Sequence, residues 1–228
     1  EGGTMVSLDC KIFSQGLEVL QVATDEGTYV FDCRALGKAR VCEVLGPLLS
    51  SKDHIKVIHD LHENASVLDA FGEVTLCGVL DMQLVAEQLW GDMFLRLDEV
   101  LEKFEIPLFS LKQKTRARRE EDKDMWARRP LQRTFIETAA LHVHLLQAAA
   151  SDIPVHVTQE DFNCLLAASK VRAEKIVVNN SAHTICFNTS DGFAMASAEL
   201  LKVTQPNNCF AGEKPVVEND VEDILRLL

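Results

Sequence analysis

The sequence predicts an α/β domain in which a mixed sheet is flanked by helices. β-rich segments open the chain, and amphipathic helical segments then alternate with short apolar strands. The 228 residues, 47% hydrophobic and 25% charged, suit one globular domain with a sizeable core. Because the final third departs from this alternation, we divide the chain into a domain over residues 1–150 and a C-terminal extension over residues 151–228 that packs on the same domain.

Three strands are expected at the start of the chain. Residues 6–13 (VSLDCKIF) alternate between two faces, so Asp9 and Lys11 share one face of the strand. Residues 17–24 and 28–32 are β-rich and flank a short Asp-Glu-Gly turn, which is typical of a hairpin. A carboxylate on a buried strand needs a partner, and we expect Lys11 to supply it for Asp9.

Helices and short strands follow in alternation. Apolar residues at helical spacing predict a helix over residues 41–49, which Pro47 should shorten or kink. The apolar run at residues 55–59 is typical of a buried strand. The other expected elements are helices at 63–71, 82–90, 93–106 and 131–150, and a strand at 74–81.

The last third has a different pattern. Residues 151–171 predict a strand or loop followed by a helix. Residues 174–180 and 183–189 are β-like and are separated by turn-forming Asn and Ser residues. Residues 218–228 have the pattern of an amphipathic helix with an Asn or Asp cap.

Composition and charge narrow the possible partners. The sequence has no apolar run of about 18 residues, so we expect no membrane partner. Its seven cysteines include no Cys-x-x-Cys pair, which indicates reduced thiols in an intracellular protein. The net charge is −12, yet residues 112–133 hold nine Lys or Arg against four Asp or Glu. This basic segment predicts a localised polyanion contact, and the alternative is a solvated, charge-laced helix or loop.

Four stretches of the chain carry a resemblance to a known family. They are VSLDCKIF, YVFDCRALG, IKVIHDLHENASVLDAFG with VLDMQLVAEQL, and WARRPLQ with AALHVHLLQ. In this order, over residues 5–150, they resemble the RNase D-like branch of the DEDD 3′–5′ exonucleases. Within that branch they are most similar to the group that contains Egalitarian and exonuclease-domain-containing protein one. The resemblance implies a ribonuclease H-like 3′–5′ exonuclease fold, followed here by the C-terminal extension.

The resemblance also implies a centre of four carboxylates that hold two Mg²⁺ ions and thereby activate water. At those four positions this sequence has Asp9, Lys11, Asn64 and His142, while Thr138 replaces a helper Tyr or His. The four positions carry four negative charges in the family, but here their net charge is zero when His142 is neutral. An ammonium about 4 Å from a dication would be repelled by roughly 8 kcal/mol at an effective dielectric near 20. We therefore expect no catalytic residue, no metal and no cofactor.

The function that follows is a catalytically inactive 3′–5′ exonuclease homologue that binds RNA, most simply single-stranded, as an adaptor. The family context implies a small-RNA (piRNA/PIWI) silencing complex with PIWI and Tudor-domain proteins, in the cytoplasm and its germ granules. A homodimer is a further hypothesis. Trp126 either stacks on a base or packs beneath Arg-Pro. The candidate RNA contacts are Lys112, Lys114, Arg116, Arg118, Arg119, Arg128 and Arg129.

Other interpretations stay open. One is a divergent metal-dependent 3′–5′ exoribonuclease that uses Asp9 with Glu63, Asp60 or Asp69 as a relocated carboxylate. Another is a protein-interaction scaffold without RNA affinity. A zinc site is a third, because the chain has His-x-x-His at positions 59 and 62 and His-x-His at positions 142 and 144.

Some residues of the matching stretches are expected to be structural. Asp32 and Asp81 stand where a carboxylate would cap a helix or close a turn. Arg129 belongs to the Arg-Pro-Leu turn, which gives it a structural alternative to RNA contact.

Overall fold

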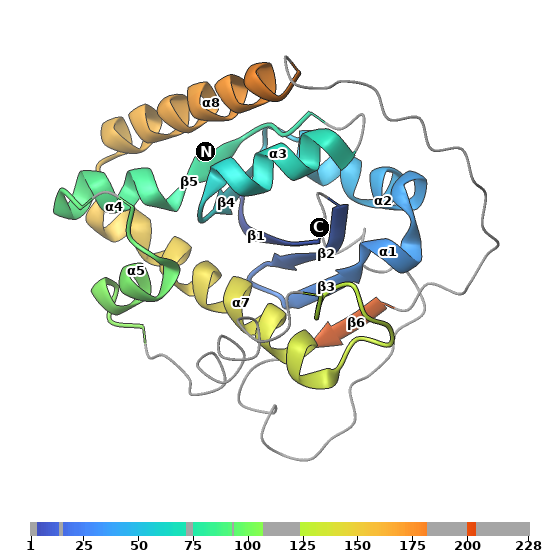
Figure 1. Ribbon diagram of the computed structural model, residues 1–228. Helices are drawn as coiled ribbons and strands as arrows, with labels where there is room; N and C mark the ends of the chain where they lie inside the picture. The colour runs from blue at the N-terminus through green and yellow to red at the C-terminus, as the bar shows by residue number, and fades with distance from the viewer. Residues whose placement is uncertain are drawn as a thin grey trace.

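A six-stranded mixed sheet forms the centre of the computed structural model, with the strand order β5-β4-β1-β2-β3-β6 (Figure 1). The structure describes residues 4–13, 16–71, 75–92, 94–106, 124–181 and 200–203. Strand β1 pairs in parallel with β4, and β4 with β5, whereas the β1/β2, β2/β3 and β3/β6 pairs are antiparallel. The strands are β1 (Thr4–Phe13), β2 (Gly16–Ala23), β3 (Thr28–Asp32), β4 (His54–Ile58), β5 (Val79–Asp81) and β6 (Leu200–Val203).

Helices cover the sheet, as the fold class predicts. They are α1 (Cys33–Leu36), α2 (Lys38–Ser50), α3 (Leu61–Phe71), α4 (Met82–Trp90), α5 (Leu97–Lys103), α7 (Arg133–His156) and α8 (Gln159–Ser181). Helix α7 packs on β1, β2 and β3, and α8 lies along α3 and β5, as the yellow and orange ribbons of Figure 1 show. None of the helices in the described ranges has the length and apolar character needed to cross a membrane.

The two faces of β1 point into different environments. Val6 and Leu8 are buried in the core cluster that β1 shares with α2 and α3. Ser7 points to the opposite face, where its hydroxyl donates a 2.9 Å hydrogen bond to Gln147 Oε1 of α7. Because side chains alternate along a strand, Asp9 and Lys11 lie on the same face as Ser7 and therefore under α7. The predicted alternation is confirmed.

Several predicted boundaries are wrong. Pro47 lies inside α2 without ending it. The strand expected at 74–81 is limited to β5, and the helix expected at 93–106 to α5. Helix α7 continues to His156 where a strand or loop was expected, and the β-like residues 174–180 are helical in α8. The β-like segment 183–189 and the helix expected at 218–228 lie outside the described residues.

An ion pair holds α8 against the sheet. Asp81, at the end of β5, has no exposed surface, and its Oδ2 lies 2.5 Å from Arg172 Nη1 of α8. The Asp81 amide donates a 2.9 Å hydrogen bond to Ser169 Oγ. Asp81 Oδ1 also accepts from the Gln83 amide at 3.0 Å, so it caps α4 as predicted. The boundary drawn between residues 150 and 151 falls within α7, and α8 packs directly on the exonuclease-like sheet.

Candidate functional site

Asp9, Lys11 and His142 meet between β1 and α7. The Lys11 ammonium forms an ion pair with Asp9 Oδ2 and lies 3.3 Å from His142 Nδ1. His142 Nδ1 is in turn 3.7 Å from the same Asp9 oxygen. The side chains are mostly covered, with 11% of Lys11 and 22% of Asp9 exposed. The three side chains therefore form one cluster, and the Asp9–Lys11 ion pair within it is the pair that the two-residue alternation predicts.

The ionisation of Asp9 depends on these neighbours. Burial disfavours the carboxylate, but the Lys11 charge and the hydrogen bond to His142 outweigh it, so the pKa of Asp9 lies well below its usual value. Asp9 thus remains negative over the physiological range. The Asp9 carboxylate and the Lys11 ammonium together make the pair internally neutral.

The lowered pKa of Asp9 predicts how stability depends on acid. The Asp9 contribution is fully present above the unfolded pKa of about 4 and is lost as the pH falls toward the lower folded value. Asp9→Asn should therefore cost free energy of unfolding at neutral pH, and this deficit should shrink below about pH 4. Denaturant unfolding of both proteins between neutral pH and pH 2.5 measures the difference. A deficit that stayed constant with pH would contradict this explanation. So would a Lys11→Met protein whose stability depended on acid in the same way as that of the wild type, because the Asp9–Lys11 pair would then not be the cause.

Asn64 links α3 to β1. Its Oδ1 accepts a 2.8 Å hydrogen bond from the Cys10 amide of β1, between Asp9 and Lys11. Its Nδ2 donates to the His59 carbonyl at 3.3 Å and to the Asp60 carbonyl at 3.0 Å. Asp60 has a φ of 61°, in the left-handed region that is unfavourable for most residues, so the amide holds this turn. A carboxylate could not donate these two bonds, and Asn64 is therefore suited to a structural role.

Thr138 and His142 are four residues apart on α7 and lie on one face of that helix. Thr138 is buried, and its hydroxyl donates a 2.7 Å hydrogen bond to the Thr134 carbonyl of its own helix. His142 lies beside Asp9, as the family resemblance implies.

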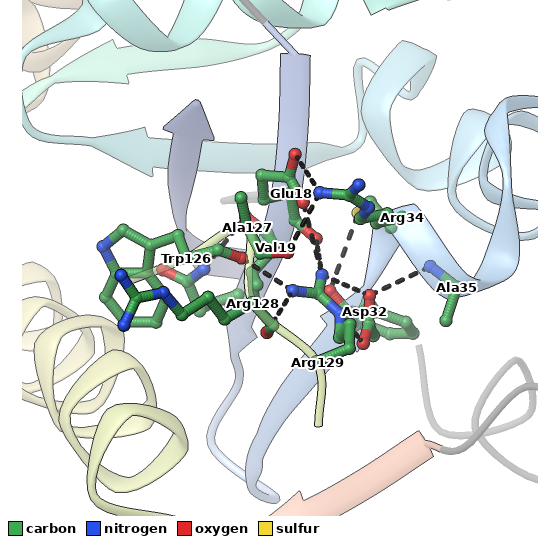
Figure 2. Close-up of polar contacts among 12 residues, drawn as sticks. Glu18, Val19, Asp32, Arg34, Ala35, Trp126, Ala127, Arg128 and Arg129 are labelled. Carbon is green, nitrogen blue, oxygen red and sulfur yellow. Dashed lines mark hydrogen bonds and ion pairs between the residues drawn. The ribbon is translucent and has the colours of Figure 1, made fainter. Parts of the chain in front are cut away.

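Arg129 is the centre of a second ion-pair cluster, shown in Figure 2. Its Nη2 donates to Asp32 Oδ1 at 2.6 Å, and its Nε lies 2.6 Å from Asp32 Oδ2. Glu18 Oε2 is 3.4 Å from the same guanidinium, and Arg34 approaches Glu18 Oε1 at 3.5 Å. Arg129 Nη1 also donates to the Trp126 carbonyl at 2.7 Å. The cluster fixes the end of the basic segment to β2 and β3.

This cluster clarifies the predicted roles around it. Asp32 caps α1 through a 3.0 Å bond from the Ala35 amide, as expected. Arg129 has the structural role given as its alternative, and as an RNA contact it remains only a prediction. Glu18 and Arg34 were not anticipated. The signal for Glu18 was a carboxylate within the apolar strand Leu-Glu-Val-Leu, which needs a cation when it is buried.

Trp126 brings the basic segment next to the Asp9 centre. It is buried against Phe135 of α7, and its ring centroid lies 5.8 Å from Lys11 Nζ. This is within cation–π distance. Trp126 therefore packs in the core beside the Asp9 centre. Of the remaining RNA-contact candidates, Arg128 is described and exposed, while Lys112, Lys114, Arg116, Arg118 and Arg119 lie outside the described residues.

The described residues form neither the zinc site nor the relocated carboxylate site that the sequence left open, as far as their side chains are described. Within the described ranges, no three His, Cys, Asp or Glu side chains are placed to hold a metal ion. The histidines at positions 59, 62, 142 and 144 are among these residues, so they do not form the zinc site that was considered. The side chains of Glu63 and Asp69 are outside the described part, so the relocated-carboxylate hypothesis is untested there.

Comparison with known proteins identifies the domain. The family model for the 3′–5′ exonuclease domain matches residues 5–153, which is most of the chain. The chain belongs to the 3′–5′ exonuclease family. No curated protein sequence matches it significantly.

Solved structures share the fold of this exonuclease domain. Escherichia coli RNase D, an exoribonuclease involved in structured RNA processing, is 19% identical with a TM-score of 0.58 over 78% of this chain. The catalytic core of Trypanosoma brucei RRP6 is 16% identical with a TM-score of 0.60 over 77% of the chain. Brucella melitensis NrnC, solved with bound Mg²⁺, is 16% identical with a TM-score of 0.62 over 82%. The chain covers 45% of that RNase D, 46% of that RRP6 core and 92% of NrnC.

The four positions of this exonuclease domain do not fit a pair of Mg²⁺ ions. Mg²⁺ takes oxygen ligands, usually several waters together with one or two carboxylates for each ion. Here Asp9 is the carboxylate among the four, and Lys11 occupies its Oδ2. The amide oxygen of Asn64 is already bonded to the Cys10 backbone. The donor set is therefore poor in oxygen ligands and is neutralised by its own lysine.

Proposed function

We propose that this chain is a non-catalytic member of the 3′–5′ exonuclease family that binds RNA. The observation that carries the proposal is the Lys11 ammonium, which pairs with Asp9 and lies 3.3 Å from His142 Nδ1. Two-metal hydrolysis needs cations to activate water and to stabilise the leaving oxygen. An ammonium at this position repels those cations and takes the ligand they would use.

RNA is the ligand class that the chain supports best. The family match and the RNase D-like fold favour a nucleic-acid ligand. Trp126 belongs to the basic segment and its ring centroid lies 5.8 Å from the Lys11 ammonium, so an RNA strand that reaches the Asp9 centre comes close to this part of the segment. The remaining surface is acidic overall and would repel the backbone elsewhere.

A protein that binds RNA but does not cleave it can act as an adaptor between that RNA and other proteins. The resemblance to the Egalitarian-like group leads us to propose a small-RNA silencing complex with PIWI and Tudor-domain proteins, in the cytoplasm and germ granules. A homodimer is part of the same proposal. Because the chain spans less than half the length of E. coli RNase D, activities of the whole protein belong to the proposal as well.

A nuclease assay tests the absence of catalysis. Purified protein is incubated with end-labelled single-stranded RNA and with either Mg²⁺ or Mn²⁺, and the products are resolved by length. We expect no shortening beyond that of the Asp9→Ala variant. Metal-dependent shortening that disappears in Asp9→Ala would instead favour the divergent exoribonuclease.

Charge reversal tests the role of the basic segment in RNA binding. Reversing Arg116, Arg118 and Arg119 to Glu should weaken single-stranded RNA binding and lower the slope of log K against log salt by about two, since each lost phosphate contact removes about 0.7. Fluorescence anisotropy over a salt series measures both effects. Reversal of the exposed Lys38, Arg40 and Lys170 is the matched control. Unchanged RNA binding after reversal of Arg116, Arg118 and Arg119, or no salt-sensitive binding by the wild-type protein, would favour a protein scaffold without RNA affinity.

A further inference from the structure

The mismatch between the site and Mg²⁺ has a consequence for how RNA is held. We propose that Lys11 binds an RNA backbone phosphate directly, so that RNA binding at the Asp9 centre requires no divalent cation. This inference rests on the proposed RNA-binding function and adds the residue and the charge that perform it.

The geometry leaves Lys11 able to make such a contact. An ammonium has three N–H donors. Among the described residues, its hydrogen-bonding partners are Asp9 and His142, which leaves one donor for a further acceptor. The Lys11 side chain is 11% exposed and those of Asp9 and His142 are each 22% exposed, so solvent reaches the edge of this cluster. A phosphate oxygen that enters from solvent can therefore meet the ammonium.

Charge balance favours a phosphate without a metal. A centre of four carboxylates repels an RNA backbone until dications neutralise it. Here the Asp9 charge is already balanced by Lys11, and a hydrogen bond between an ammonium and an anionic oxygen is among the stronger ones. The lysine thus supplies the positive charge that metal ions bring to a carboxylate centre.

The chain contains a matched cluster that serves as a control. Lys103 of α5 pairs with Asp92 at 2.7 Å, and its ammonium lies 5.2 Å from the ring centroid of Trp90. It repeats the lysine, carboxylate and tryptophan groups of the Asp9 centre at α4 and α5, away from β1. Lys103→Met therefore removes the same chemical group without altering the proposed site.

Binding of a labelled single-stranded oligouridine, measured in EDTA and in Mg²⁺, tests the proposal. We expect wild-type affinity to survive EDTA. Lys11→Met should weaken binding roughly tenfold, as expected for loss of a hydrogen bond to a charged group, while Lys103→Met should not. Asp9→Asn should bind more tightly, because it removes the anion that competes with phosphate.

The double variant Asp9→Asn/Lys11→Met distinguishes a direct contact between Lys11 and phosphate from an effect of the net charge of the centre. It also avoids leaving the Asp9 carboxylate without its partner. If Lys11 touches phosphate, the double variant stays weak although its centre is neutral. Recovery of wild-type affinity in the double variant, or loss of wild-type binding in EDTA, would overturn the proposal. A wild-type protein that binds no RNA even at low salt would instead refute the proposed function itself.

Discussion

Replacing Arg172 with methionine is expected to lower the free energy of unfolding by about 3–5 kcal/mol, the cost of breaking a buried ion pair. Asp81 is completely buried, and Arg172 is the cation that neutralises it at 2.5 Å. Methionine keeps much of the side-chain volume but leaves the carboxylate without its cation. Denaturant unfolding measured by circular dichroism gives the change.

The acid dependence of this loss identifies its cause. Burial raises the pKa of Asp81, although Arg172 opposes the shift, so the carboxyl is readily protonated once the arginine is gone. The deficit of Arg172→Met should therefore shrink as the pH falls, because protonation removes the uncompensated charge. Lys170→Met is the control because Lys170 is exposed. Among the described residues its one ion-pair partner is Glu174, one helical turn away, with 3.7 Å between Nζ and Oε1. Equal destabilisation by both variants would contradict the role given to Arg172.

Replacing Lys11 with glutamate is expected to destabilise the protein by about 2–3 kcal/mol in EDTA. The change removes the partner of Asp9 and places a second carboxylate beside it. Breaking a buried pair costs about 3–5 kcal/mol, and we reduce this figure because Asp9 is partly exposed and His142 remains 3.7 Å away. Thermal or denaturant unfolding in EDTA measures the loss.

The control for this second prediction is Lys103→Glu, which creates a like-charge pair with Asp92 on the surface. Because 35% of Lys103 and 48% of Asp92 are exposed, we expect a loss below about 1 kcal/mol. If Lys11→Glu cost no more than this control, Lys11 would not be needed to balance Asp9.

The main features of the fold and the pairing of Asp9 with Lys11 could be predicted from short-range sequence patterns, whereas the place of His142 beside Asp9 is implied by the family resemblance. Two-residue alternation places Asp9 and Lys11 on one face of strand β1. Four-residue spacing places Thr138 and His142 on one face of helix α7. The capping role of Asp32 follows from a carboxylate at a strand-to-helix junction. These features depend on contacts within one element or between neighbours.

The features that were missed depend on contacts distant in sequence. Arg129 joins Glu18 and Asp32, which precede it by about a hundred residues, and no local pattern pairs them. The helical state of residues 174–180 was missed because Ile and Val favour strands. In the structure, α8 is held by Arg172 on Asp81 and by the burial of Ala173, and these tertiary contacts override the local preference.

We propose that Lys11 takes the place of metal ions at the Asp9 centre. Soaking crystals of the wild-type protein in Mn²⁺ and measuring anomalous diffraction tests this directly. We predict no anomalous peak within coordination distance of Asp9, with Lys11 still paired to the carboxylate. Two manganese ions bound at Asp9, with Lys11 displaced, would contradict it.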